Sequence, residues 1–142
     1  MKAFALGLAA TLLVGQALAA DARQFATLPP AAQDSLREEM LANLLAINEI
    51  LTLMAANKVA EAGEVAEKSL GQSAMGKHRS KPLDARPGPH MPPEMHGIGI
   101  DGHRAASEFA RAAASGDRER AVALLPGLTA ACVACHYSWR TR

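Results

Sequence analysis

The amino-acid sequence predicts an all-α fold, an antiparallel four-helix bundle, from its composition and its hydrophobic periodicity. Alanine and leucine, both strong helix formers, dominate a chain of 142 residues that is 49% apolar and only 4% aromatic. Apolar residues recur at helical spacing in several segments, and no segment shows the alternation of a half-buried β-strand. The length is enough for one domain with a core and too short for two.

Residues 1–20 have the features of a secretory signal peptide. Lys2 precedes an apolar run over residues 3–14, and residues 17–19 (Ala-Leu-Ala) give the small-x-small pattern that signal peptidases cleave. The run is shorter than the roughly 20 apolar residues that span a bilayer. We therefore expect cleavage near Ala19 and Ala20.

After this cleavage, residues 21–142 are expected to form a single domain in the periplasm, with no stable membrane insertion. Loss of Lys2 leaves 14 of the 15 basic side chains against 14 acidic ones, so a nucleic-acid partner held by a broad basic surface is not expected. Residues 21–70 carry eight acids and four bases, whereas residues 71–142 carry six acids and ten bases. This asymmetry either orients a docking partner or reflects solvated helix faces of mixed sign.

Four segments of the mature chain show helical periodicity. They are residues 31–56, residues 58–70, the stretch from Pro93 to about Ser115, and residues 117–139 with a break or bend at Pro126. A proline-rich loop is expected over about residues 76–93. The expected inward residues of the first helix are Leu36, Met40, Leu44, Ile47, Leu51 and Met54. Those of the third helix are Met95, Ile98, His103, Ala106 and Phe109.

The most specific motif is the run Cys132-Val133-Ala134-Cys135-His136 near the end of the last expected helix. C-x-x-C-H is the attachment pattern for a c-type haem. On a helix, Cys132 and Cys135 share one face, so both thiols can form thioethers with the vinyl groups of one porphyrin. His136 can then place its imidazole under the iron as the proximal ligand. The sequence therefore predicts one covalently attached haem c.

Three other roles are open to a cysteine pair at this spacing. A structural disulfide suits an exported protein, but four residues within a helix are a poor place for a stabilising crosslink. A thioredoxin-like redox pair belongs at a helix N-terminus after a strand, and a zinc site lacks a second cysteine pair here. The adjacent histidine and the exported chain both favour haem.

The end of the chain, residues 129–140 (Thr-Ala-Ala-Cys-Val-Ala-Cys-His-Tyr-Ser-Trp-Arg), resembles the class II c-type cytochromes, the cytochrome c prime and its low-spin relatives. That family has a C-terminal C-x-x-C-H followed by x-x-aromatic-basic. The resemblance is specific over these last residues and extends to helix number and order in the mature chain. It implies a haem between the helices of a bundle. Trp139, where the family more often has Tyr or Phe, and the long loop are departures.

The resemblance also implies the origin of the sixth iron ligand. In this family it comes from the first helix, as Met in low-spin electron carriers or as an apolar side chain in five-coordinate cytochromes c prime. Met40, followed by Asn43, resembles the Met-x-x-Asn stretch of the low-spin members, which makes Met40 the expected distal ligand. A Met at helical spacing can equally be a core residue. A thioether ligand raises the haem potential and keeps small gases off the iron.

Three further residues are expected near the haem. Arg140 can reach a haem propionate as a charge-assisted pair or stay solvated. Trp139 and Leu128 share the face of the two cysteines, and we expect both to be buried against the porphyrin or the first helix.

These features predict a periplasmic monohaem cytochrome that exchanges electrons with redox partner proteins. We do not expect an enzyme, because the sequence shows no carboxylate pair, Ser-His-Asp set or phosphate-binding glycine loop. The family often pairs through its first helices, so a homodimer is a candidate assembly, although no heptad seam specifies one.

Two alternative functions stay open. The first is a five-coordinate protein that binds or scavenges NO or CO, with Met40 as a wall of the distal pocket. The second is copper handling by soft and imidazole donors in and after the loop. These donors are Met75, His78, His90, Met91, Met95, His96 and His103. His96 and His103 are also alternative sixth ligands of the haem.

Overall fold

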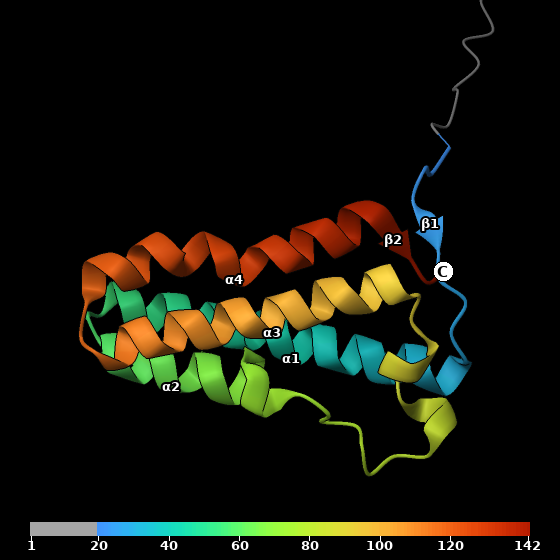
Figure 1. Ribbon diagram of the computed structural model, residues 1–142, viewed down its shortest axis with the longest axis horizontal. Helices are drawn as coiled ribbons and strands as arrows, with labels where there is room; N and C mark the ends of the chain where they lie inside the picture. Colours follow the sequence, from blue (N-terminus) through green and yellow to red (C-terminus); the bar gives the residue numbers. More distant parts are fainter. Residues whose placement is uncertain (1–19) are drawn as a thin grey trace, which may run out of the picture.

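Four α-helices dominate the computed structural model, which describes residues 20–142. They are α1 (Pro30–Ala55), α2 (Val59–Leu70), α3 (Pro93–Ala114) and α4 (Arg118–Ser138). Figure 1 shows them side by side along the long axis, and they pack in sequence order, α1 on α2, α2 on α3 and α3 on α4. An all-α fold of four helices is thus confirmed. The expected signal peptide lies, apart from Ala20, outside the described residues.

The helix boundaries follow from local chemistry. α1 begins at Pro30, since proline is tolerated in a first turn, and it ends shortly before Asn57, whose φ is 59°. Gly71 follows the last residue of α2. Asp117 caps α4, because its side chain accepts a hydrogen bond of 2.9 Å from the backbone N–H of Arg120. The boundaries lie within one or two residues of those predicted from the sequence.

α4 continues through Pro126, so a break of the helix at this residue is not observed. Proline removes one backbone donor from a helix, but Ala121 and Leu128 on either side of it are buried and anchor the helix. Among the described residues α4 alone is long and apolar enough to cross a membrane, a test that core helices of soluble proteins also pass.

Two short strands differ from the sequence prediction. β1 (Gln24–Phe25) pairs in parallel with β2 (Trp139–Arg140), and the backbone N–H of Ala26 donates to the carbonyl of Arg140 at 2.9 Å. Strands of two residues are too short to show an alternating pattern. The pairing fixes the N-terminal segment beside the end of α4, where Ala26 and Leu28 are buried.

Most of the core between the helices is built from small side chains. Phe109 of α3 and Ile50 of α1 are the largest fully buried side chains, and alanines fill much of the rest. A Cβ added at Gly63 of α2 would lie only 2.8 Å from the Cβ of Ala113. Small residues therefore let α2 and α3 approach closely.

The prediction for the inward face of α1 was partly wrong. Met54 is buried, but Leu44 and Leu51 are 66% and 50% exposed. The buried row runs instead through Ala46 and Ile50, because this is the side on which α1 meets its neighbouring helices. On α3 the prediction is confirmed for three buried residues, Met95, Ala106 and Phe109.

Candidate functional site

The C-x-x-C-H motif forms the last turns of α4. Cys132 is exposed, Cys135 is half-buried, and both cysteines are free rather than joined in a disulfide. Burial raises the pKa of the Cys135 thiol, and the neighbouring Cys132 raises it further. A thiol with a raised pKa stays protonated at neutral pH, which is the opposite of an activated redox cysteine.

A cavity of about 650 Å³ opens beside the motif. Its walls come from α1, the loop after α2, α3, α4 and the C-terminal residues. All seven site residues expected from the sequence line it: Met40, Leu128, Cys132, Cys135, His136, Trp139 and Arg140. The volume falls in the range of roughly 300–1,000 Å³ that is usual for cofactor sites. The fold therefore joins the motif to Met40, which is distant in sequence.

The inner walls of the cavity are apolar. Leu128 and Trp139 are buried, as expected. Trp139 packs with the buried Met95 and with Leu36 and Ile98, which are half-buried. Such a lining suits a flat apolar ring system, since apolar and aromatic side chains supply most of the surface in cofactor pockets.

The remaining cavity wall is strongly basic. Seven cationic side chains line it: Arg23, Arg37, Lys77, Arg79, Arg86, Arg140 and Arg142. Glu39 is the one carboxylate among the described residues that line the cavity. This imbalance favours a ligand that combines an apolar body with anionic groups.

Arg140 has an unsatisfied donor at this wall. Its Nε is buried without a hydrogen-bond partner among the described residues, and the nearest carboxylate oxygen, of Asp21, is 3.7 Å away. Its guanidinium lies 5.0 Å from the centre of the Phe25 ring. Arg140 thus already has an acidic partner in Asp21. The residue also lines the cavity, where its positive charge favours an anionic group of a ligand.

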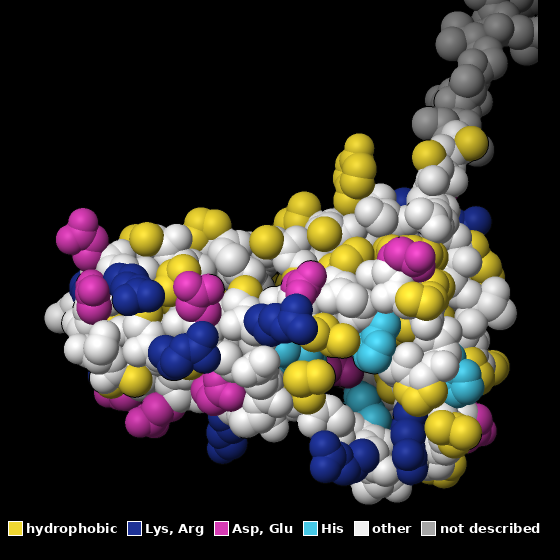
Figure 2. Space-filling model, in the orientation of Figure 1, with side chains coloured by type: hydrophobic (Ala, Val, Ile, Leu, Met, Phe, Trp, Pro, Cys, Tyr) yellow, Lys and Arg dark blue, Asp and Glu magenta, His cyan; other side chains and the backbone are white. Residues whose placement is uncertain are grey.

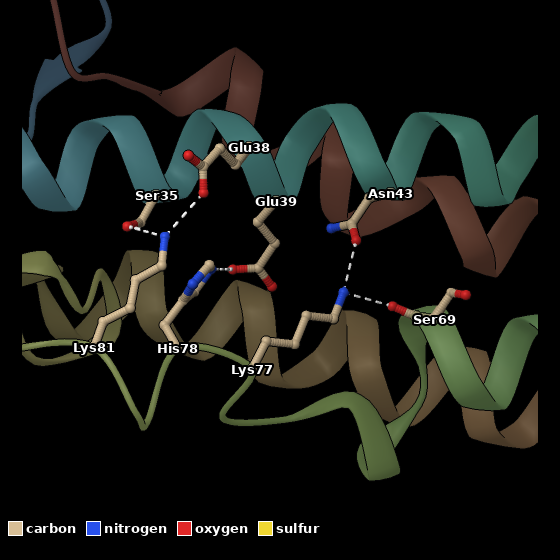
Figure 3. Close-up of polar contacts among 8 residues, drawn as sticks. All are labelled: Ser35, Glu38, Glu39, Asn43, Ser69, Lys77, His78 and Lys81. Atoms are coloured by element: carbon tan, nitrogen blue, oxygen red, sulfur yellow. Dashed lines mark hydrogen bonds and ion pairs between the residues drawn. The ribbon is translucent and has the colours of Figure 1, made fainter.

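The loop between α2 and α3 is fastened to α1 beside Met40. It contains three short turns, η1 (Gln72–Ala74), η2 (Leu83–Ala85) and η3 (Gly88–His90). Figure 3 shows three loop side chains reaching α1, and two of them, Lys77 and His78, line the cavity. The contacts join Lys77 Nζ to Asn43 Oδ1 at 3.2 Å, His78 Nε2 to Glu39 Oε2 at 3.2 Å, and Lys81 Nζ to Glu38 Oε2 at 2.8 Å.

Sequence reasoning missed this attachment. The sequence predicts only a proline-rich loop with soft and imidazole donors here, because no spacing rule links residues 77–81 to residues 38–43. The signal available in the sequence was that one segment carries basic residues and the other acidic ones. In the structure, Lys81 contacts Glu38 and lowers the pKa of its carboxyl group.

Three of the seven residues considered for copper make a polar contact through one ring nitrogen. His78 contacts Glu39, His90 contacts the carbonyl of Leu83 at 3.0 Å, and His103 contacts the carbonyl of Leu70 at 2.7 Å. Figure 2 shows the histidines of this face in the half of the molecule that holds the loop. Within residues 20–142, no group of three or more His, Cys, Asp or Glu residues is arranged to hold a metal ion.

Comparison with known proteins yields no relative for this chain. No protein-family model, no curated protein and no solved structure matches it. The function of the cavity must therefore be inferred from its own residues.

Proposed function

We propose that this chain is a periplasmic monohaem cytochrome of the class II type, an antiparallel four-helix bundle that acts in electron transfer. The observation that carries the proposal is the cavity that brings the C-x-x-C-H motif of α4 together with Met40 of α1. The basic wall, to which Arg140 belongs, supports it independently. A haem has an apolar ring and two propionates, so the lining fits this group.

Each expected residue has a place in this proposal. Cys132 and Cys135 hold the haem through thioethers, and His136 is the proximal ligand. Met40 is the distal ligand on the opposite helix. The haem supplies one-electron chemistry when bound, and a thioether opposite an imidazole favours a high potential.

Three further residues hold the haem through packing and charge. Leu128 and Trp139 are buried and pack the ring, while Arg140 pairs with a propionate. These residues bind and orient the haem, and we assign a catalytic role to none of them.

The surroundings of the motif support exchange of electrons with a partner protein. Cys132 is exposed, and its neighbours Val133 and Tyr137 are 66% and 84% exposed. An edge of the haem bound there would be open to a partner, and the basic cavity wall favours a partner with an acidic face. A homodimer is also part of the proposal, supported by four exposed leucines on α1: Leu41, Leu44, Leu45 and Leu51.

The direct test of the cofactor is a mass measurement on the exported protein made in a host with haem maturation machinery. The wild-type chain is expected to keep a haem after denaturation in acidified organic solvent, because thioether bonds survive this treatment. The double variant Cys132→Ser/Cys135→Ser is expected to lose it. Ser138→Ala, in the same turn but outside the motif, serves as the control and should keep the haem. A wild-type chain without covalent haem would refute the proposal.

A further inference from the structure

His103 of α3 lies half-buried on the wall of the cavity. Its Nδ1 is 2.7 Å from the carbonyl oxygen of Leu70 and 3.0 Å from that of Gly71. Carbonyl oxygens can only accept hydrogen bonds, so Nδ1 carries the proton and donates it. In the neutral imidazole this leaves Nε2 with a free lone pair.

The Nε2 of His103 has no hydrogen-bond partner within residues 20–142. Two loop histidines differ: the Nε2 of His78 contacts Glu39, and the Nε2 of His90 contacts the carbonyl of Leu83. A ring that donates one N–H to a backbone carbonyl and leaves the other nitrogen free is the usual arrangement of a metal-ligating histidine. His103 therefore already makes, through Nδ1, the backbone hydrogen bond that a metal-ligating histidine usually makes.

The packing of α3 against α4 is close at the residues that precede His103 and Cys132. A Cβ added to Gly102 would lie 2.9 Å from the Cβ of Ala131, so the two helices are in close contact at this pair. His103 directly follows Gly102, and Cys132 directly follows Ala131. Both His103 and Cys132 line the same cavity as Met40.

We propose that His103 is a second distal donor of this cavity, whose Nε2 takes the sixth position on the haem iron when the Met40 thioether does not occupy it. The inference rests on the proposed function. The exchange replaces an iron–sulfur bond by an iron–nitrogen bond, and the neutral imidazole binds through Nε2 without releasing a proton. Imidazole nitrogen is a good ligand for iron, so the iron would remain six-coordinate and closed to small gases.

The test compares haem-loaded Met40→Ala with Met40→Ala/His103→Asn, by ferric electron paramagnetic resonance and by CO binding to the ferrous protein. Asparagine keeps an amide donor for the Leu70 and Gly71 carbonyls but removes the ring nitrogen. Met40→Ala is expected to stay low-spin with a lowered midpoint potential. The double variant is expected to become high-spin and to bind CO at least tenfold faster, and added imidazole should restore its low-spin spectrum.

Met40→Ala/His96→Ala is the matched control, because His96 lines the same cavity from α3 but is exposed. It should behave like Met40→Ala alone. The inference is overturned if Met40→Ala is already high-spin and binds CO as fast as the double variant, or if the His96 change has the same effect as the His103 change. That result leaves the proposed function standing, whereas a wild-type chain without haem overturns both. Far-UV circular dichroism checks that each variant is folded.

Discussion

Glu67 of α2 is the centre of a hydrogen-bond network that joins α2 to α3. Its Oε2 accepts from the buried Ser107 hydroxyl at 2.5 Å, and its Oε1 accepts from the backbone N–H of Ser73 at 3.0 Å. The Ser107 oxygen in turn accepts from the backbone N–H of Gln72 at 2.9 Å. The hydrogen bond from Ser107 is the main cause of the lowered pKa of Glu67. The network orders the turn that leads into the loop.

Ser107→Ala is expected to lower the free energy of unfolding by about 1–3 kcal/mol at pH 7, because Glu67 loses a donor and Gln72 loses an acceptor. Folding lowers the pKa of Glu67, so the ionised carboxylate stabilises the folded state fully above its ordinary pKa of 4.5. This stabilisation is lost as the pH falls below that value. The difference between wild type and variant should therefore shrink in acid.

Urea denaturation of the haem-loaded proteins at pH 7 and pH 4 measures this difference. Ser80→Ala, at an exposed position in the loop, is the control and should change the free energy of unfolding little at either pH. A gap between wild type and Ser107→Ala that is the same at both pH values would contradict the assignment to Glu67.

At the scale of elements, two helix contacts depend on glycine. Gly63 lets α2 approach Ala113 and the Ala110 carbonyl of α3, and Gly102 lets α3 approach Ala131 of α4. By contrast, a Cβ at Gly97 of α3 would meet nothing within 4 Å. Close helix packing therefore requires glycine at positions 63 and 102, whereas a larger side chain would fit at position 97.

Gly63→Ala is expected to lower the free energy of unfolding by about 1–3 kcal/mol, because the added methyl group would overpack the contact with α3. Gly97→Ala is the matched control, and it should raise stability by roughly 0.5–1 kcal/mol, since alanine loses less backbone entropy in a helix. Thermal and urea denaturation measure both changes. A stabilised Gly63→Ala protein would show that the two helices are not held at this distance.

The sequence predicted the helices well because their ends carry local signals, such as Asn57 after α1 and Gly71 after α2. It failed on the face of α1. This helix has leucines in several directions, and periodicity alone could not show that Ala46 and Ile50 meet the other helices while Leu44 is exposed. Periodicity likewise could not show the contact of Glu67 with Ser107, because nothing in the local sequence of Glu67 indicates the distant serine.

For the whole molecule, the cavity lies at the end of the bundle that carries β1, β2 and the loop (Figure 1). β1 and β2 hold the N-terminal segment there, and the loop is fastened to α1 on the other side. Cys132, Cys135 and His136 could be proposed as haem-binding residues from their spacing alone. The hydrogen bonds of His103 and Lys81 could not be predicted, because they join segments more than 30 residues apart.

The central claim is a haem iron that is ligated on both sides within this cavity. The most direct measurement is the optical spectrum of the purified ferrous protein before and after addition of carbon monoxide. The proposal predicts sharp low-spin bands that the gas leaves unchanged, since His136 and Met40 occupy both axial positions. Broad high-spin bands that shift on addition of the gas would contradict it, and would show an open distal site that captures gas rather than a carrier of electrons.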